Sequence, residues 1–381
     1  MPLPNFDSIK SIAVGKDNPN KQQIVHILKA ITDQEVPPKQ KHIRGIILAT
    51  FNGRSSSFFY DTALKLAIYT NPVVCWKFLY VIHKLFRDGH RECINDGLRH
   101  ATRVSQLQSA WSNHATKCGY PIVDFCQLII RKFRLHRKYG ILPGCLELTP
   151  NELKNCLSAQ ADHLFQFSVD LMDMLEETLR FKDVVLLSVE GIQAASFTPP
   201  GQCKLIPLIQ CIQDSAALYE LSVQVIFKLH ELLGNGTMSG HRERFKELHI
   251  SVKRFFENVS HMQYFRSFVH IPSISQNPPN FCIQSELNEH TTLRVTTNET
   301  PPPLPPPVKT QETTYTSPTT TPLATSDENR QLSGDEDDSF ELAIIPKILS
   351  PGYLNKSPIK ETSTISSKES KMVWNFQHGY R

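Results

Sequence analysis

The sequence predicts an all-α fold, a superhelical solenoid of stacked antiparallel helices, followed by a disordered tail. Three observations lead to this prediction. From about residue 24 to residue 262, apolar residues recur at spacings of three and four, the period of an amphipathic helix. No segment shows the regular alternation of a half-buried strand. Several periodic segments exceed the usual helix length of about 11 residues, which favours stacked long helices over a compact ball.

Residues 1–19 precede the first clearly periodic segment and form a separate N-terminal segment. The stretch from Phe6 to Val14 suits a short amphipathic helix that lies on a bilayer. The alternative is a frayed terminus without a fixed role.

Residues 20–290 are expected to form one helical domain. Its first two helices have apolar faces that share the helical period, at Ile24, Leu28 and Ile31 and then at Ile43, Ile47 and Thr50. Later apolar faces follow the same period at Phe78, Leu79, Ile82, Leu85 and Phe86, at Ile209, Ile212, Ala216, Tyr219, Val223 and Ile226, and at Phe245, Leu248, Val252, Phe255, Val259 and Met262.

Two helix boundaries are also visible in the sequence. Gly89 follows an apolar face directly and suits the position after a helix C-terminus. Thr149, Pro150 and Glu152 have the spacing of a capping box, with proline in the first helical position. The apolar run after this cap continues to about Leu187, as one long helix or two.

The composition changes near residue 290, and we expect residues 291–381 to be disordered. This part contains the proline run Pro301–Pro307, a Thr- and Ser-rich stretch, and the acidic run Asp335–Asp338. Such sequences bury too little apolar surface to offset the entropy of an ordered chain. The proline run is either a plain linker or a polyproline helix for an SH3-type groove.

The net charge of +4 is distributed unevenly, and the N-terminal part of the chain is cationic. Residues 1–150 carry a net charge of +11, residues 151–290 carry −5, and residues 291–381 carry −2. This asymmetry implies a polyanionic partner, whereas the alternative is a set of ordinary solvated lysines. A basic cluster at Arg131–Lys138 is either a membrane-facing patch or a helix end that complements the dipole.

Several classes of function are excluded by what the sequence lacks. It contains no phosphate-binding G-x-x-x-x-G-K-[ST] loop, no G-x-S-x-G elbow and no H-E-x-x-H motif, so we expect no enzyme and no cofactor. His114 and Cys118 are spaced for a helical metal pair, but no second pair accompanies them, so we expect no metal site.

The cellular location follows from similar observations. There is no apolar run of about 20 residues and no secretory signal pattern. The nine scattered cysteines lack any C-x-x-C pair and are expected to be free thiols. We therefore expect a cytoplasmic protein.

The candidate site is a group of four cationic residues near the start of the chain. Lys29 lies near the end of the first periodic segment, and Lys39, Lys41 and His42 open the second. Several cations that converge on one point suit a multiply charged anion such as a polyphosphate head group.

The backbone around the second basic group favours the same ligand. Pro37 and Pro38 suit a helix start, so the N–H groups of Lys39, Gln40 and Lys41 are expected to be unpaired first-turn donors. Helix N-termini of this kind attract anions. Because the reference pKa of histidine is ~6.5, we also expect a phosphate to favour protonated His42 and binding to tighten as the pH falls from about 7.5 to 6.

The stretch from Lys29 to His42 resembles the inositide-binding lysine motif of ANTH domains. More of the chain is similar to the huntingtin-interacting-protein-1 family of endocytic adaptors, over about residues 20–290. The matching stretches are Val74–Phe78, His83–His90, Gly201–Leu205, Phe227–His230, Gly240–Phe245 and Asn277–Phe281.

This resemblance implies an ENTH/ANTH-like fold and a phosphoinositide-binding membrane adaptor in clathrin-mediated endocytosis. By the family pattern, Lys29, Lys39, Lys41 and His42 contact the head group. The implied partners are the inner leaflet of the plasma membrane, the clathrin coat and other endocytic adaptors. The implied location is peripheral, on the plasma membrane and on clathrin-coated pits or vesicles.

The chain departs from the family at its end. Family members continue into a coiled coil and a talin-like actin-binding domain, whereas this sequence ends at Arg381 without sustained heptads. We therefore expect a fragment or a short form, with actin reached only through the missing domains. The alternative function is a helical-repeat module that binds nucleic acid or phosphopeptides through the basic face. Nucleic acid is not expected, because no aromatic residues are interleaved with the motif.

Overall fold

The computed structural model describes residues 20–297 except 114–118, 190, 235, 292 and 294. The predictions for residues 1–19, for the pair His114 and Cys118, and for nearly all of the tail lie outside these described residues. The domain boundaries at residues 20 and 290 stay predictions.

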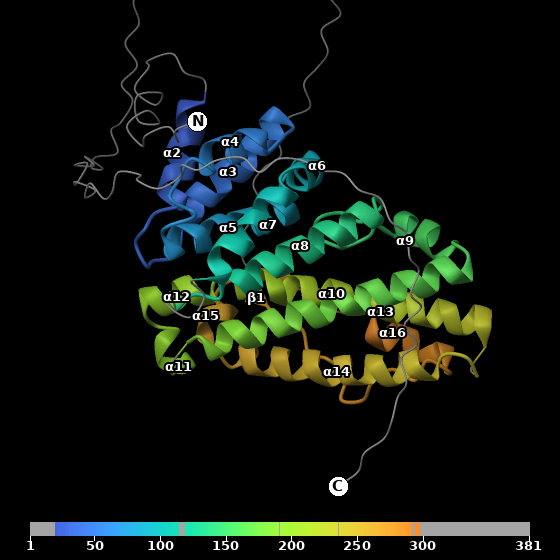
Figure 1. Cartoon of the computed structure of the whole chain (residues 1–381). Helices are drawn as coiled ribbons and strands as arrows, with labels where there is room; N and C mark the ends of the chain where they lie inside the picture. The colour runs from blue at the N-terminus through green and yellow to red at the C-terminus, as the bar shows by residue number, and fades with distance from the viewer. Residues whose placement is uncertain are drawn as a thin grey trace, which may run out of the picture. The chain divides into compact units, whose positions relative to one another are not determined.

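The described residues form a stack of helices, which confirms the predicted fold class. The first part contains α2 (Lys21–Ala30), α3 (Gln40–Gly53), α4 (Ser57–Ala63), α5 (Pro72–Asp88), α6 (Glu92–Arg99), α7 (Ala101–Ser112) and α8 (Ile122–Lys138). In Figure 1, α2, α3 and α4 (blue) lie together, and α5, α7 and α8 separate them from the longer helices that follow. α2 packs on α3, and α7 packs on α8.

The second part is built on three long helices. It contains α9 (Pro150–Leu157), α10 (Ala161–Leu187), α11 (Ile192–Ala195), α12 (Pro199–Leu205), α13 (Pro207–Leu233), α14 (Ser239–Ser260), α15 (Gln263–Arg266), the 3-10 turn η1 (Gln284–Glu286) and α16 (Leu287–His290). α10 packs along α13 and against both α8 and α14, so it joins the two parts of the stack.

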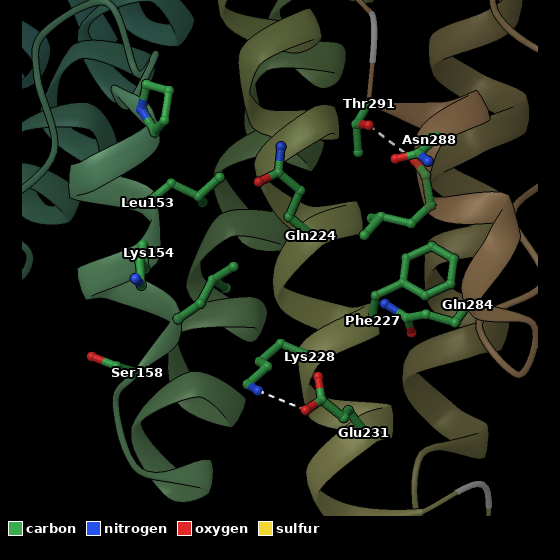
Figure 2. A pocket seen from close by; sticks show the side chains of 13 residues that line it. Leu153, Lys154, Ser158, Gln224, Phe227, Lys228, Glu231, Gln284, Asn288 and Thr291 are labelled. Carbon is green, nitrogen blue, oxygen red and sulfur yellow. Dashed lines mark hydrogen bonds and ion pairs between the residues drawn. The ribbon is translucent and has the colours of Figure 1, made fainter.

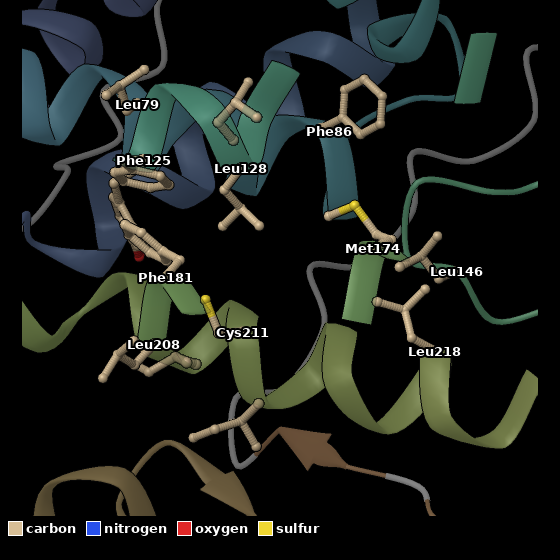
Figure 3. Close-up of a cluster of buried hydrophobic side chains, with 14 of the residues drawn as sticks. Leu79, Phe86, Phe125, Leu128, Leu146, Met174, Phe181, Leu208, Cys211 and Leu218 are labelled. Atoms are coloured by element: carbon tan, nitrogen blue, oxygen red, sulfur yellow. The ribbon is translucent and has the colours of Figure 1, made fainter. Parts of the chain in front are cut away.

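The hydrophobic core runs without a break from the first helices to the last. Figure 3 shows Phe125 of α8 and Phe181 of α10 lying against each other, with ring centroids 4.8 Å apart. Trp76 of α5 is fully buried beside them and donates its indole N–H to the Cys203 carbonyl at 2.9 Å. This bond fixes α5 to α12 across the core.

Most of the expected helix boundaries are confirmed. Thr149 and Glu152 form the predicted capping box, with Pro150 in the first helical position. The apolar run after it is two helices, α9 and α10. α5 ends at Asp88, as the position of Gly89 predicted. The Gly89 backbone is extended (φ −79°, ψ 176°), however, so this glycine does not adopt the left-handed conformation common after helices.

The chain also contains a strand pair that the periodicity did not reveal. β1 (Val269–His270) pairs antiparallel with β2 (Thr296–Thr297), with Val269 opposite Thr297. Two-residue strands are too short for an alternating pattern to be recognised in a sequence. Within the described ranges, no helix is both long enough and apolar enough to span a bilayer.

Candidate anion-binding site

The candidate site lies where α2 and α3 meet. Lys29 lies in the last turn of α2, and Lys39 is the N-cap of α3, whose first turn contains Lys41 and His42. All three lysine side chains are exposed, whereas His42 is buried. Because α2 packs on α3, Lys29 lies near the start of α3, although that start is ten or more positions later in the sequence.

The start of α3 differs from the expectation based on the prolines. The helix begins at Gln40, because Lys39 has an extended backbone (φ −63°, ψ 130°) and is the cap rather than a helical residue. The His42 N–H donates to the Lys39 carbonyl at 2.9 Å. Within the described part of the chain, no side chain caps this first turn. The helix start is therefore one to two residues later than predicted.

The three predicted lysines lie near enough to His42 to affect its ionisation. Burial, His26 and the charges of Lys29, Lys41 and Lys39 together lower the pKa of His42 to about 4. Each of the three lysines is thus close enough to disfavour a further positive charge on this ring. In the free protein the pKa of His42 therefore lies below its reference value of ~6.5, and the expected tightening of binding between pH 7.5 and 6 stays a prediction.

His26 of α2 is a member of this cluster that sequence reasoning missed. Its Nδ1 atom lies 3.1 Å from Nδ1 of His42, and the ring centroids are 5.4 Å apart. Burial and the charges of Lys29 and Lys41 also lower the pKa of His26. A signal was present, since His26 precedes Lys29 by three residues and such positions share one helix face.

Gly45 allows the two histidine rings to approach. A Cβ atom at this position of α3 would lie 2.5 Å from the Cδ2 and Nε2 atoms of His26. Any other residue would therefore push the His26 ring away from α3. The sequence contains no indication of this requirement, because it arises from packing between two helices.

A buried side chain of α5 holds the loop between α2 and α3. The Lys77 ammonium donates to the Thr32 hydroxyl at 2.8 Å and to the Gln34 carbonyl at 2.7 Å. Lys77 is only 1% exposed, and burial lowers its pKa. Tyr120 adds a further bond, from its hydroxyl to the Glu35 carboxylate at 3.2 Å. These contacts fix the backbone that leads to Lys39.

The basic cluster at residues 131–138 does not form a single exposed patch. Lys132 is buried and contacts Asp214 of α13, and Lys138 pairs with Asp170 of α10. Arg137 donates to the Leu98 carbonyl at 3.4 Å. Several of these cations thus serve contacts within the fold.

A groove of about 620 Å³ lies elsewhere, between α9, α13 and α16. Figure 2 shows Leu153 and Phe227 on opposite sides of it, with Lys228 paired to Glu231 at 2.9 Å. No member of the cation cluster on α2 and α3 lines this groove. This groove is therefore separate from the candidate site.

The described residues thus define a class of α-helical domains, a stack of helices with a cluster of cationic residues where α2 and α3 meet. The sequence profile of the ANTH domain matches residues 22–291, and the chain belongs to this family. The resemblance inferred from the sequence is thereby confirmed.

The chain is also similar to two relatives and to one solved structure. It is 36% identical over 274 residues to Huntington interacting protein related 1 of Caenorhabditis elegans, covering 71% of this chain and 29% of that protein. It is 35% identical over 294 residues to Huntingtin-interacting protein 1 of Homo sapiens, covering 76% of this chain and 28% of that protein. The chain thus spans less than a third of the length of either relative.

The solved structure supports the fold. It is the ENTH domain from epsin-2 in complex with phosphatidylinositol 4,5-bisphosphate, which matches with a TM-score of 0.59 at 18% identity and covers 71% of this chain and 99% of that domain.

Proposed function

We propose that this ANTH domain binds phosphoinositide head groups and acts as a peripheral membrane adaptor in clathrin-mediated endocytosis. The observation that carries the proposal is the position of three exposed lysines, Lys29, Lys39 and Lys41, near His42 where α2 packs on α3. Three exposed ammonium groups around one buried ring suit a ligand with several phosphates better than a single phosphate. The epsin-2 domain with bound phosphatidylinositol 4,5-bisphosphate, which shares the fold, supports binding to the same class of ligand.

The proposed location follows from the ligand. A domain of this kind would associate with the inner leaflet of the plasma membrane at coated pits. Contacts with the clathrin coat, with other adaptors and with actin remain part of the proposal, because the longer relatives extend well beyond the matched region. The site offers cationic donors for binding, and we propose a binding role rather than catalysis.

The site is tested by reversing two of its charges. A polybasic surface gains about 1 kcal/mol per Lys near an anionic leaflet, so Lys39→Glu with Lys41→Glu should lower affinity for inositide vesicles more than tenfold. The measurement is pelleting of the full chain with vesicles that contain phosphatidylinositol 4,5-bisphosphate. The matched control is Lys154→Glu with Lys246→Glu, which changes the net charge equally at exposed positions on α9 and α14.

The control separates a specific site from general attraction. Equal losses in both double variants would mean that net charge alone drives binding. Wild-type pelleting by the Lys39 and Lys41 variant would show that the assigned site is wrong. Strong competition by RNA or by a phosphopeptide, with little vesicle binding, would favour the alternative helical-repeat function.

A further inference from the structure

His26 is the one cluster member that the lysine motif does not contain, and its contact with His42 is specific. The two Nδ1 atoms face each other at 3.1 Å, a hydrogen-bond distance. A neutral imidazole has one ring nitrogen that donates and one that accepts. One of the two rings must therefore donate from Nδ1, and the other must accept at Nδ1.

The direction of this bond decides what His42 offers to a ligand. If His26 donates, the proton of neutral His42 lies on Nε2, and that nitrogen becomes a donor. If His42 donates, its Nε2 atom is an acceptor and repels phosphate oxygens. The partner of one ring nitrogen thus fixes the role of the other.

The surroundings disfavour a positive charge on either ring, so the direction of the bond matters. Lys29 and Lys41 lie close to both histidines, Lys39 lies close to His42, and each disfavours protonation. A neutral ring can donate to phosphate only through its single N–H. Gly45 lets the His26 ring sit against α3, where this bond forms.

We propose that His26 is a positioning residue, which donates from Nδ1 to Nδ1 of His42 and so presents the His42 Nε2–H to a phosphate of the head group. This inference deepens the proposed function and rests on it. The lysines supply charge, whereas the histidine pair supplies one oriented, uncharged donor beside them.

The test removes the Nδ1 donor and then restores it. In His26→Phe the ring remains but the Nδ1 donor is lost, so the free protein no longer holds His42 in one tautomer and orientation, and affinity for soluble inositol trisphosphate should fall about two- to threefold. In His26→Asn the side-chain amide nitrogen is the same number of bonds from Cβ as Nδ1 of histidine is. It can therefore replace the lost donor, and affinity should be largely rescued. His26→Ala is a second loss variant, in case the phenylalanine ring does not fit. Titration calorimetry at neutral pH measures all three.

A double-mutant cycle shows whether His26 acts through His42. In a His42→Gln background, His26→Phe should have no further effect. A loss that persists in that background would mean that His26 contacts the ligand itself or merely supports the fold, and would overturn the inference.

The protonated nitrogen is also observed directly. Long-range proton–nitrogen NMR spectra of the wild-type protein with bound inositol trisphosphate should place the His42 proton on Nε2 and the His26 proton on Nδ1. Finding the proton on Nδ1 of His42 in the wild-type complex would refute the proposal. If the Lys39 and Lys41 charge reversal leaves binding unchanged, the proposed function fails. If that reversal abolishes binding but His26→Phe does not weaken it, only the role of His26 fails.

Discussion

At the scale of single residues, His42 shows how position changes chemistry. The sequence correctly suggests a histidine beside three lysines, and its reference pKa of ~6.5 suggests a charge change near neutral pH. Burial and the neighbouring cations lower the pKa of His42 to about 4, so the free ring is neutral under physiological conditions. Its contribution to binding is that of a neutral group until a ligand changes its surroundings.

The pH dependence of binding follows from this shift. A bound phosphate offsets the lysine charges, so the pKa of His42 is higher in the complex than in the free protein. Binding then takes up a proton, and affinity rises as the pH falls through the complex pKa, levelling off below about 4. We expect the steep part of the rise to lie below about pH 6, rather than between 7.5 and 6 as the reference value suggests.

This prediction is measured by titration calorimetry with inositol trisphosphate at several pH values. The ligand phosphates also titrate near pH 6. The relevant quantity is therefore the difference in affinity for inositol trisphosphate between wild type and His42→Gln at each pH. A difference that stays constant down to about pH 4 would exclude a proton-linked role for His42.

The two histidines differ in how far their roles could be predicted from the sequence. Lys29, Lys39, Lys41 and His42 follow a pattern within one short stretch, and such a pattern is visible in the sequence. The part played by His26 depends on how α2 packs on α3, which no spacing along the chain specifies.

At the scale of elements, the connection between α2 and α3 is as important as the helices themselves. The buried Lys77 of α5 donates to the Thr32 hydroxyl and to the Gln34 carbonyl, both in this connection. The ammonium therefore holds the backbone that positions Lys39 without itself reaching the surface.

Lys77→Met tests this role. The change removes both bonds while keeping a long side chain in the core, so we expect a several-fold loss of affinity for inositol trisphosphate with the helical fold retained. Binding to vesicles with only monovalent anionic lipids should change as little as it does in the exposed control Lys154→Met. Thr32→Val, which removes one of the two bonds, should give a smaller loss. Wild-type head-group affinity in both variants would show that the connection holds its shape without Lys77.

Helix boundaries differ in how well the sequence predicts them. The capping box at Thr149 was predicted correctly because its partners lie within four residues. The start of α3 was placed too early because prolines permit a helix start without requiring one. Contacts to Lys77, more than 35 positions away, hold the preceding backbone and are invisible locally.

At the scale of the whole described fold, a buried ionic cluster joins the early helices to α13. Asp214 of α13 accepts from His83 at 2.8 Å, from Arg87 at 2.8 Å and from Lys132 at 2.5 Å. Although burial opposes ionisation, Lys132, His83 and Arg87 hold the pKa of Asp214 well below its usual range. The cluster thus fixes α5 and α8 to α13 in one arrangement.

Removing the anion from this cluster should be costly. Asp214→Asn leaves Lys132 and Arg87 without their buried carboxylate, and we expect the free energy of unfolding to fall by about 3–5 kcal/mol. Urea unfolding followed by circular dichroism measures the change. The exposed control Asp162→Asn, in the first turn of α10, should alter stability by at most about 1 kcal/mol. A similarly small effect for Asp214→Asn would mean that the cluster contributes little.

Periodicity predicted that the helices exist, and it predicted the longest of them closely. It did not predict which helices pack together or that Lys132 and Arg87 are buried. In the sequence, Lys132 belongs to a basic run with the composition of a surface. Its burial becomes understandable only when Asp214, 82 positions away, is placed opposite it.

The exposure of Lys29, Lys39 and Lys41 has a kinetic consequence for the proposed adaptor. Cations that stand out from the surface, rather than line an enclosed cleft, can let a lipid leave without any structural rearrangement. Each molecule would then dwell only briefly on one lipid, and lasting attachment would require many copies held together. A phosphatase that trims the lipid could therefore disassemble such a cluster without ever acting on the protein.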